Sequence, residues 1–267
     1  MSDMNERYET QSLITRNDRG TVERAFDRQS KRLVAVKRAS GPDAEAALVS
    51  ESAILGTLHH PNIVTILDSG RDSQGGFMVT ELADGQSLET LTATQRLSLS
   101  AFEQLVEQTL DAVGAAHEKN VLHLDIKPQN IMVAVDVAGR LSVKLLDFGA
   151  ARSGAVVADK YSPVMGSLFF MAPERFDRAP ADTRADLYSL GCVYYQALAG
   201  RPPFTGDTGP QVMVAHLRHQ FAPLAEIRPD LPAYVPRWVE WLFSQKPEDR
   251  PASASAAFAA FRAQRAT

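Results

Sequence analysis

The sequence predicts an α+β fold in two parts, a small β-rich part with one main helix and a larger, mainly helical part. Three observations predict this. Residues 13–81 contain short alternating apolar runs separated by turn residues, a pattern typical of strands. After "SLETL", which begins at Ser87, the apolar residues recur with helical spacing. The chain has 267 residues, of which 45% are hydrophobic and 22% charged, so it can bury sizeable cores.

Short strands joined by turns are expected in the first part. The stretch "LITRNDRGTV", residues 13–22, indicates a first strand pair with the turn chemistry of "NDRG" at its centre, and "RLVAVKRA", residues 32–39, alternates like a strand. "NIVTILDSG" and "GFMVTELADG" supply two further strands, separated by the turn-rich "GRDSQGG".

The main helix of the first part is predicted over residues 44–60, "AEAALVSESAILGTLHH", ending before Pro61. Leu48, Leu55 and Leu58 share one face of this helix. Glu51 lies on the same face, three residues after Leu48 and four before Leu55. An acid on an apolar face requires a partner, although a solvated helix acid is the plainer alternative.

Helices are predicted over residues 100–119 and 186–200, the second stopping at Gly200, and over the C-terminal "SASAAFAAFRAQRAT", where Phe258 and Phe261 are expected to dock on the body. Between the first two lies a hairpin pattern, "NIMVAVDVAGRLSVKLLDFG", with its turn at "AGR". This hairpin places "HLDIKPQN" just before one strand and "DFG" just after the next.

Composition disfavours several classes of function. Lys and Arg total 28 against 32 for Asp and Glu, a net charge of -4, so neither nucleic acid nor an anionic membrane is an expected partner. The single cysteine, Cys192, cannot form an internal disulfide, and its apolar setting predicts an inert core residue. The N-terminus lacks a secretion signal and no apolar run approaches 18 residues, which makes a cytoplasmic setting the default expectation.

The hairpin is expected to bring Asp125, Lys127, Asn130 and Asp147 into one cleft. Two carboxylates and an amide oxygen are hard ligands that suit magnesium, and an ammonium group offsets phosphate charge. This set therefore indicates a site where a hydroxyl attacks a magnesium-bound phosphate.

The sequence resembles the eukaryotic-like serine/threonine protein kinases. The motifs "VAVK", "HLDIKPQN", "DFG" and "APE" occur in the family's order, and the resemblance runs from about Tyr8 to Arg262. It implies a bilobal protein-kinase-like fold, with residues 1–83 as the N-lobe and hinge and residues 84–267 as the C-lobe of one kinase domain. It also implies ATP and Mg²⁺ as cofactors and protein substrates with Ser/Thr acceptors.

The resemblance assigns the nucleotide-binding residues. Lys37 is similar to the strand lysine that holds the α- and β-phosphates, and Glu51 to its helix partner. Thr80 is similar to the gatekeeper, and Glu81 to Ala83 to the hinge whose backbone contacts adenine. The remaining members are those expected around the adenine ring and over the phosphates, namely Val22, Ala35, Met132 and Gly20.

The resemblance also assigns the chemistry. Asp125 is similar to the catalytic base that orients the acceptor hydroxyl, and Lys127 to the lysine beside the transferring phosphate. Asn130 and Asp147 are similar to the magnesium ligands. Structural roles fall to the ion-paired Glu174 and Arg250, to Asp186, which ties down the catalytic-loop backbone, and to His123.

The phosphate-covering hairpin departs from the family pattern. Thr15 and Asn17 stand where two of three glycines usually lie, and Gly20 is the third. Side chains there hinder close backbone approach to phosphate. Asp18 adds a repelling charge that Arg19 can offset. We expect the hairpin still to cover ATP while contributing less affinity than usual.

Two further departures concern regulation and docking. Leu124 stands where many kinases have an arginine that reads a phosphate on the activation segment. Basal activity is therefore expected not to require phosphorylation of Ser153, Tyr161 or Ser162. Ser167 replaces the usual threonine and keeps a hydroxyl able to bridge Asp125 and Lys127.

Three functions fit these residues. The leading expectation is an ATP- and Mg²⁺-dependent serine/threonine protein kinase, because every group expected to touch the reacting atoms is present. A pseudokinase acting as a scaffold is the alternative that the altered hairpin and Leu124 motivate. A small-molecule kinase is disfavoured by "MGSLFFMAPE", which resembles a protein-docking platform. The sequence does not indicate an oligomeric state.

Overall fold

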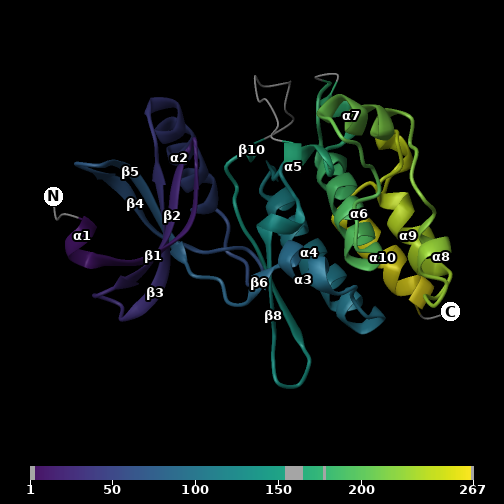
Figure 1. Ribbon diagram of the computed structural model, residues 1–267, viewed down its shortest axis with the longest axis horizontal. Helices are drawn as coiled ribbons and strands as arrows, with labels where there is room; N and C mark the ends of the chain where they lie inside the picture. The colour runs from purple at the N-terminus through teal and green to yellow at the C-terminus, as the bar shows by residue number, and fades with distance from the viewer. Residues whose placement is uncertain (1–3, 154–164, 177–178, 266–267) are drawn as a thin grey trace.

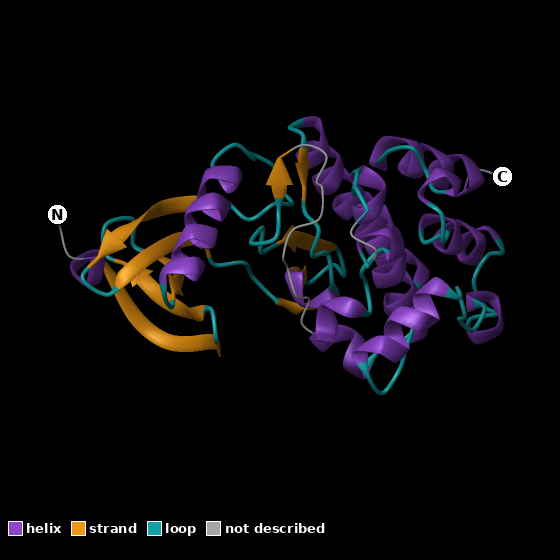
Figure 2. Ribbon diagram, turned by 90° about the horizontal axis from the view of Figure 1, so that it is seen from above, coloured by secondary structure: helices purple, strands orange, loops and turns teal. Residues whose placement is uncertain are grey.

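The computed structural model describes residues 4–153, 165–176 and 179–265, which form two bodies along the long axis of the molecule (Figure 1). One body is a five-stranded antiparallel sheet with one long helix, and the other is mainly helical (Figure 2). The predicted α+β class is therefore confirmed.

The sheet has the strand order β1-β2-β3-β5-β4. Its strands are β1 (Tyr8–Asn17), β2 (Gly20–Asp27), β3 (Arg32–Ala39), β4 (Ile66–Asp72) and β5 (Gly75–Glu81). Paired residues of an antiparallel sheet project from the same face. The register pairs Val22 with Lys37 and Ala35 with Thr80, and therefore places these four residues on one face.

Each face of the sheet is covered differently. Helix α2 (Pro42–Leu55) packs against the face that carries Lys37, where its buried leucines join Met78. The opposite face carries a separate apolar cluster, which the short helix α1 (Met4–Arg7) covers. That cluster comprises Met4, Tyr8, Ala25, Val34, Val36 and Val79.

Two boundaries differ from the prediction. Strand β1 begins at Tyr8, five residues before Leu13, because Tyr8 and Met4 bury apolar surface under the sheet. The predicted end of the main helix was wrong: α2 ends at Leu55, where Gly56 follows. Glycine is a weak helix former, and the next N–H groups bond only three residues back, which closes the helix as a turn.

The second body is built around two long helices, α4 (Leu99–Glu118) and α6 (Thr183–Ala199). Helix α6 is buried nearly all round, as its apolar sequence predicts. It ends at Gly200, whose φ of 81° is the left-handed conformation that glycine adopts readily. The other helices are α3 (Leu88–Thr94), α5 (Met165–Leu168), α7 (Gly209–Leu217), α8 (Leu224–Ile227), α9 (Tyr234–Leu242) and α10 (Ala254–Arg265), with short 3₁₀ turns η1 (Pro128–Asn130), η2 (Pro173–Arg175) and η3 (Pro247–Asp249).

Two side-chain predictions for this body are confirmed. Phe261 is buried and Phe258 is partly buried against the same core, so the C-terminal helix docks as expected. Cys192 is fully buried, and burial raises the pKa of its thiol well above the ordinary value. The thiol is therefore inert. In the described ranges, no helix combines the length and apolar character needed to cross a bilayer.

The predicted hairpin links the two bodies. Strands β8 (Ile131–Val135) and β9 (Leu141–Leu145) pair with each other, β8 also pairs with β6 (Gln86–Ser87), and β7 (Val121–Leu122) pairs with β10 (Arg152–Ser153). Leu145 bridges to Ile63, and the Lys144 ammonium lies 2.6 Å from the Glu81 carboxylate. These contacts hold the residues before β8 and after β9 at the junction.

Candidate active site

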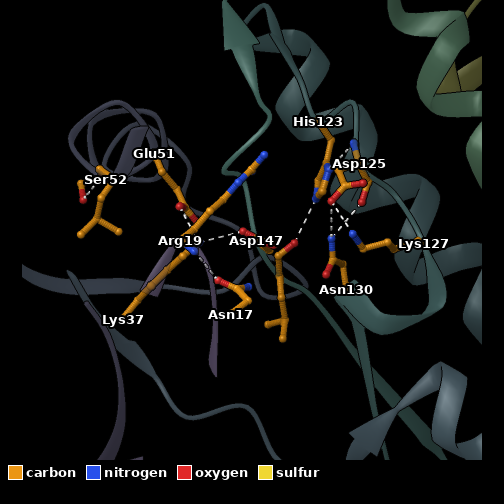
Figure 3. Close-up of polar contacts among 12 residues, drawn as sticks. Asn17, Arg19, Lys37, Glu51, Ser52, His123, Asp125, Lys127, Asn130 and Asp147 are labelled. Atoms are coloured by element: carbon orange, nitrogen blue, oxygen red, sulfur yellow. Dashed lines mark hydrogen bonds and ion pairs between the residues drawn. The ribbon is translucent and has the colours of Figure 1, made fainter. Parts of the chain in front are cut away.

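Four elements deliver the predicted site residues to the junction between the bodies (Figure 3). Lys37 comes from β3, Glu51 from α2, and Asp147 from the loop after β9. The loop between β7 and β8 carries Asp125, Lys127 and Asn130. Residues from distant parts of the sequence therefore converge on one place.

Lys37 binds two carboxylates. Its ammonium lies 2.7 Å from Glu51 Oε2 and 2.9 Å from Asp147 Oδ1. Burial raises the pKa of Glu51, an effect that the Lys37 ammonium opposes. Burial likewise opposes ionisation of Asp147, but the same ammonium holds the pKa of that carboxyl well below its usual range. The predicted partner of the acid on the apolar helix face is therefore Lys37.

Asp125 is held by its two neighbours in the loop. The Lys127 ammonium lies 2.6 Å from Asp125 Oδ2, and Asn130 Nδ2 donates to the Asp125 carbonyl at 2.9 Å. Lys127 also donates to Ser167 Oγ at 3.0 Å. The bridging group is thus the lysine, which links Asp125 to Ser167, rather than the predicted serine hydroxyl.

The backbone before Asp125 is fixed from α6. The Asp186 carboxylate accepts the N–H groups of His123 and Leu124 at 2.9 and 2.8 Å, and His117 Nε2 lies 2.8 Å from the same carboxylate. Burial opposes the charge, but the His117 contact holds the pKa of Asp186 below its usual range. Asp186 therefore ties down the loop, as predicted.

His123 supports the loop through packing. It is 1% exposed, its Nε2 lies 3.0 Å from the Leu146 carbonyl oxygen, and its ring packs on Phe148 with centroids 4.5 Å apart. Asp147 lies between Leu146 and Phe148 in the sequence. Its φ is 57°, and its carboxylate points toward Lys37. The structural role expected for His123 agrees with this setting.

Arg175 is a site residue that sequence reasoning missed. From η2 it donates a hydrogen bond to the carbonyl oxygen of Leu124. Its neighbour Glu174 forms the predicted ion pair with Arg250, at 2.7 Å. An arginine directly after "APE" was the available signal, but nothing in the sequence placed it beside residue 124.

The donor set fits a magnesium ion. The Asp147 side chain is 42% exposed and so open to a ligand. Asn130 uses its amide nitrogen on Asp125, which turns its amide oxygen away from that residue (Figure 3). One carboxylate and one amide oxygen suit Mg²⁺, which binds few protein ligands and completes its shell with phosphate and water. The described part of the chain holds no group of three or more His, Cys, Asp or Glu side chains arranged for a metal ion.

The residues expected around adenine are partly buried at the junction. Val22, Ala35 and Thr80 share the Lys37 face of the sheet, and Met132 lies on β8. The Glu81 N–H donates to the Thr65 carbonyl at 3.0 Å, and the Glu81 carbonyl accepts a hydrogen bond from Thr80 Oγ1 at 3.1 Å, so both backbone groups of Glu81 have partners within the protein. This restricts the predicted hinge contacts.

The hairpin expected to cover the phosphates has a tight two-residue turn between β1 and β2. Asn17 pairs with Gly20, and Asn17 Oδ1 accepts the Arg19 N–H at 2.9 Å (Figure 3). Gly20 has a φ of 148°, and a Cβ there would lie 1.8 Å from the Arg38 carbonyl oxygen. Gly20 is therefore required by the sheet itself, whereas Asn17 supports the turn with its side chain.

We call the loop between β7 and β8 the catalytic loop. A cavity of about 720 Å³ lies beside it, with Gln129 of the loop in its lining. Phe169, Phe170 and Pro202 supply apolar walls, and Glu89 and Asp207 supply two carboxylates.

Of the three residues whose phosphorylation is expected not to be required, Ser153 is exposed at the end of β10, while Tyr161 and Ser162 lie outside the described residues.

Comparison with known proteins assigns the chain to a family. The description "Protein kinase domain" matches residues 8–261. The chain is 34% identical over 256 residues to "Serine/threonine-protein kinase PknA" of Mycobacterium tuberculosis, covering 91% of this chain and 58% of that protein. It is 33% identical over 252 residues to "Serine/threonine-protein kinase PknE" of Mycobacterium bovis, covering 91% and 43% respectively.

A third relative has a similar identity. "Probable serine/threonine-protein kinase PknB" of Bifidobacterium longum is 34% identical over 244 residues, covering 85% of this chain and 35% of that protein. The chain thus spans between about a third and three fifths of the length of these curated relatives. The chain belongs to the protein kinase family, in its eukaryotic-like serine/threonine branch.

Proposed function

We propose that this chain transfers the γ-phosphoryl group of ATP to serine or threonine hydroxyls of proteins. The observation that carries the proposal is the pair of contacts made by Lys37, to Glu51 at 2.7 Å and to Asp147 at 2.9 Å. Protein kinases use a strand lysine paired with a helix glutamate to hold the phosphates, and that pair must be in place for activity. Here it is closed.

In the proposed reaction, Asp125 accepts a hydrogen bond from the acceptor hydroxyl and directs its oxygen at the γ-phosphorus. The phosphorus–oxygen bond to the β-phosphate breaks as the new bond to the acceptor oxygen forms, and the hydroxyl proton passes to Asp125. Lys127 offsets the negative charge of the transferring group. Lys37 holds the α- and β-phosphates.

Asp147 and Asn130 are the residues that would hold Mg²⁺. When bound, the ion neutralises charge on the β- and γ-phosphate oxygens. The Lys37 ammonium contacts Asp147, and the Lys127 ammonium contacts Asp125, which Asn130 also contacts. Each of the two proposed ligands therefore has a cation nearby that can offset phosphate charge. Catalysis then rests on positioning and electrostatics.

The cavity beside the loop supports a protein acceptor. Its lining combines aromatic walls with carboxylates and amide groups, which suits side chains flanking an acceptor residue. The relatives are named serine/threonine-protein kinases, which supports hydroxyl acceptors of that kind. We further propose that residues 1–83 and 84–267 act as the two lobes, hinged at Glu81 to Ala83.

A scaffold without transfer is the second candidate, and the hairpin favours it. Thr15 and Asn17 place side chains where close approach to phosphate is usual. The hairpin does not by itself remove any group that touches the reacting atoms. Transfer therefore remains the proposal that more residues support.

The test is transfer of labelled phosphate from ATP with Mg²⁺ to a generic basic protein, followed by identification of the labelled amino acid. Labelled serine or threonine is expected, and Asp125→Ala should abolish the label. Glu107→Ala, an exposed acid on α4, is the matched control and should retain it. Absence of label with stable, ATP-binding protein would favour the scaffold.

A further inference from the structure

Leu124 adopts a backbone conformation that leucine avoids. Its φ is 61°, in the left-handed region, although it is neither glycine nor asparagine. Such a residue costs roughly 1–2 kcal/mol and persists only where its surroundings hold it. The residue is also 6% exposed, so its peptide groups depend on protein partners rather than on water.

Both sides of Leu124 are held by charged groups. Its N–H donates to Asp186 Oδ1 at 2.8 Å. Its carbonyl oxygen accepts a hydrogen bond from Arg175. Because Asp125 follows directly, these two contacts hold the backbone from which the Asp125 side chain projects.

The segment that carries Arg175 is held by a buried ion pair. Arg175 ends η2, and the preceding Glu174 forms two hydrogen bonds with Arg250, at 2.7 and 2.8 Å. The Arg250 side chain is fully buried, so this pair is a rigid anchor. Arg175 therefore connects the segment held by the buried Glu174–Arg250 pair to the catalytic loop.

We propose that Arg175 is a positioning residue that holds the catalytic loop in its working conformation through the Leu124 carbonyl, so that no phosphate on the activation segment is needed. The proposal rests on the proposed kinase function and concerns the regulation of the same site. Where an arginine at position 124 would read a phosphate, an arginine from position 175 binds the backbone directly. Lys127, which donates to Ser167 at 3.0 Å, is a second link between the loop and the same segment.

The first test compares kcat and the KM for ATP in Arg175→Met, Arg175→Lys and the control Arg184→Met. Arg184 is a nearby arginine on α6 whose guanidinium pairs with Asp182 at 3.5 Å, away from the loop. We expect Arg175→Met to lower kcat at least about tenfold with KM changed less than twofold, since misplacing a reacting group reduces the rate of transfer itself. Arg175→Lys should recover part of kcat, and Arg184→Met should match the wild type.

Phosphatase treatment tests the regulatory half of the proposal. Wild-type kcat is expected to be unchanged by treatment, and the effect of Arg175→Met should be the same before and after it. Loss of wild-type activity on treatment would overturn the proposal. So would an Arg175→Met variant with wild-type kcat, or one whose loss lies in KM.

Hydrogen exchange separates failure of this proposal from failure of the kinase function. Amides of residues 122–126 should exchange faster in Arg175→Met than in wild type, while those of α4 should not change. This comparison needs no transfer. An enzyme without activity but with the expected exchange would contradict the kinase function alone, whereas unchanged exchange would contradict the role of Arg175.

Discussion

The catalytic loop and the β1–β2 hairpin border the same site, but they are held in place in different ways. In the loop, His123, Leu124 and Asn130 are 1%, 6% and 7% exposed, and each donates a hydrogen bond to a carboxylate, that of Asp186 or of Asp125. In the hairpin, β1 is exposed at every residue after Tyr8. Its strands are joined by backbone pairing, by an exposed hydrogen bond from Thr10 to Glu23, and by the Asn17 side chain at the turn.

The difference explains how the hairpin can depart from the family pattern. A buried, multiply bonded polar residue cannot be replaced without leaving a partner unsatisfied. An exposed strand that pairs through its backbone tolerates many side chains. Thr15 and Asn17 therefore replace glycine where the structure permits it, while Gly20, whose Cβ would meet the Arg38 carbonyl, is kept.

The largest effect is expected from Asp147→Ala. Removing this carboxylate takes away a magnesium ligand and one partner of Lys37, and kcat should fall by about 10³-fold or more. Kinetics with saturating ATP and Mg²⁺ measure it. Glu107→Ala provides the control, and a loss smaller than tenfold would mean that Asp147 does not hold the magnesium ion.

Asp186→Asn tests how strongly the loop is fixed. The neutral amide can no longer accept all three contacts from His117, His123 and Leu124, so the free energy of unfolding should fall by about 2–4 kcal/mol. Because the pKa of Asp186 is held below its usual range, its contribution is present above pH about 4 and is lost below it. Denaturant unfolding at pH 7 and pH 3 measures both, and equal destabilisation by Asp186→Asn at the two values would count against this reading.

Lys37→Met probes the contact between sheet and helix. We expect kcat/KM to fall about 10²-fold, because the phosphates lose their cation. The variant also leaves Glu51, 3% exposed, without its partner. Lys37→Met/Glu51→Met should therefore be about 1–3 kcal/mol more stable than Lys37→Met alone, as judged by urea unfolding. A double variant no more stable than the single one would show that Glu51 is not held by this pair.

The smallest effects should come from the hairpin. Gly20→Ala is expected to lower stability by roughly 1–3 kcal/mol, because the new methyl group meets backbone. Asn17→Gly should change it by less than about 1 kcal/mol, since glycine adopts turn conformations easily. Thermal melts of both variants decide whether the two positions differ as the structure requires.

Much of the fold was predictable because local patterns and burial agree. The apolar run ending at Gly200 is a helix that ends there, and "AGR" marks a real hairpin turn. That Glu51 has a partner could be expected from its place among leucines, and the resemblance to protein kinases named Lys37 as that partner. In these cases the local sequence pattern and the burial of side chains favour the same structure.

The remainder depends on tertiary contacts that leave little trace in the sequence. The left-handed Leu124 and its bond to Arg175 could not be read from a leucine and a distant arginine. The early start of β1 depends on Tyr8 and Met4 packing under the sheet. The end of α2 at Leu55 was missed because the buried Leu58 continues the apolar pattern beyond the helix.

Binding of ATP with Mg²⁺, measured by calorimetry, tests most directly the claim that the cluster of Lys37, Glu51 and Asp147, rather than the hairpin, governs the site. The variants are Asp18→Gly/Arg19→Gly in the turn and Lys37→Met in the cluster. We predict a Kd within about fivefold of wild type for the turn variant and at least about twentyfold weaker for Lys37→Met, since charge-assisted contacts contribute about 1.5–3 kcal/mol. A turn variant that loses as much affinity as Lys37→Met would contradict the account.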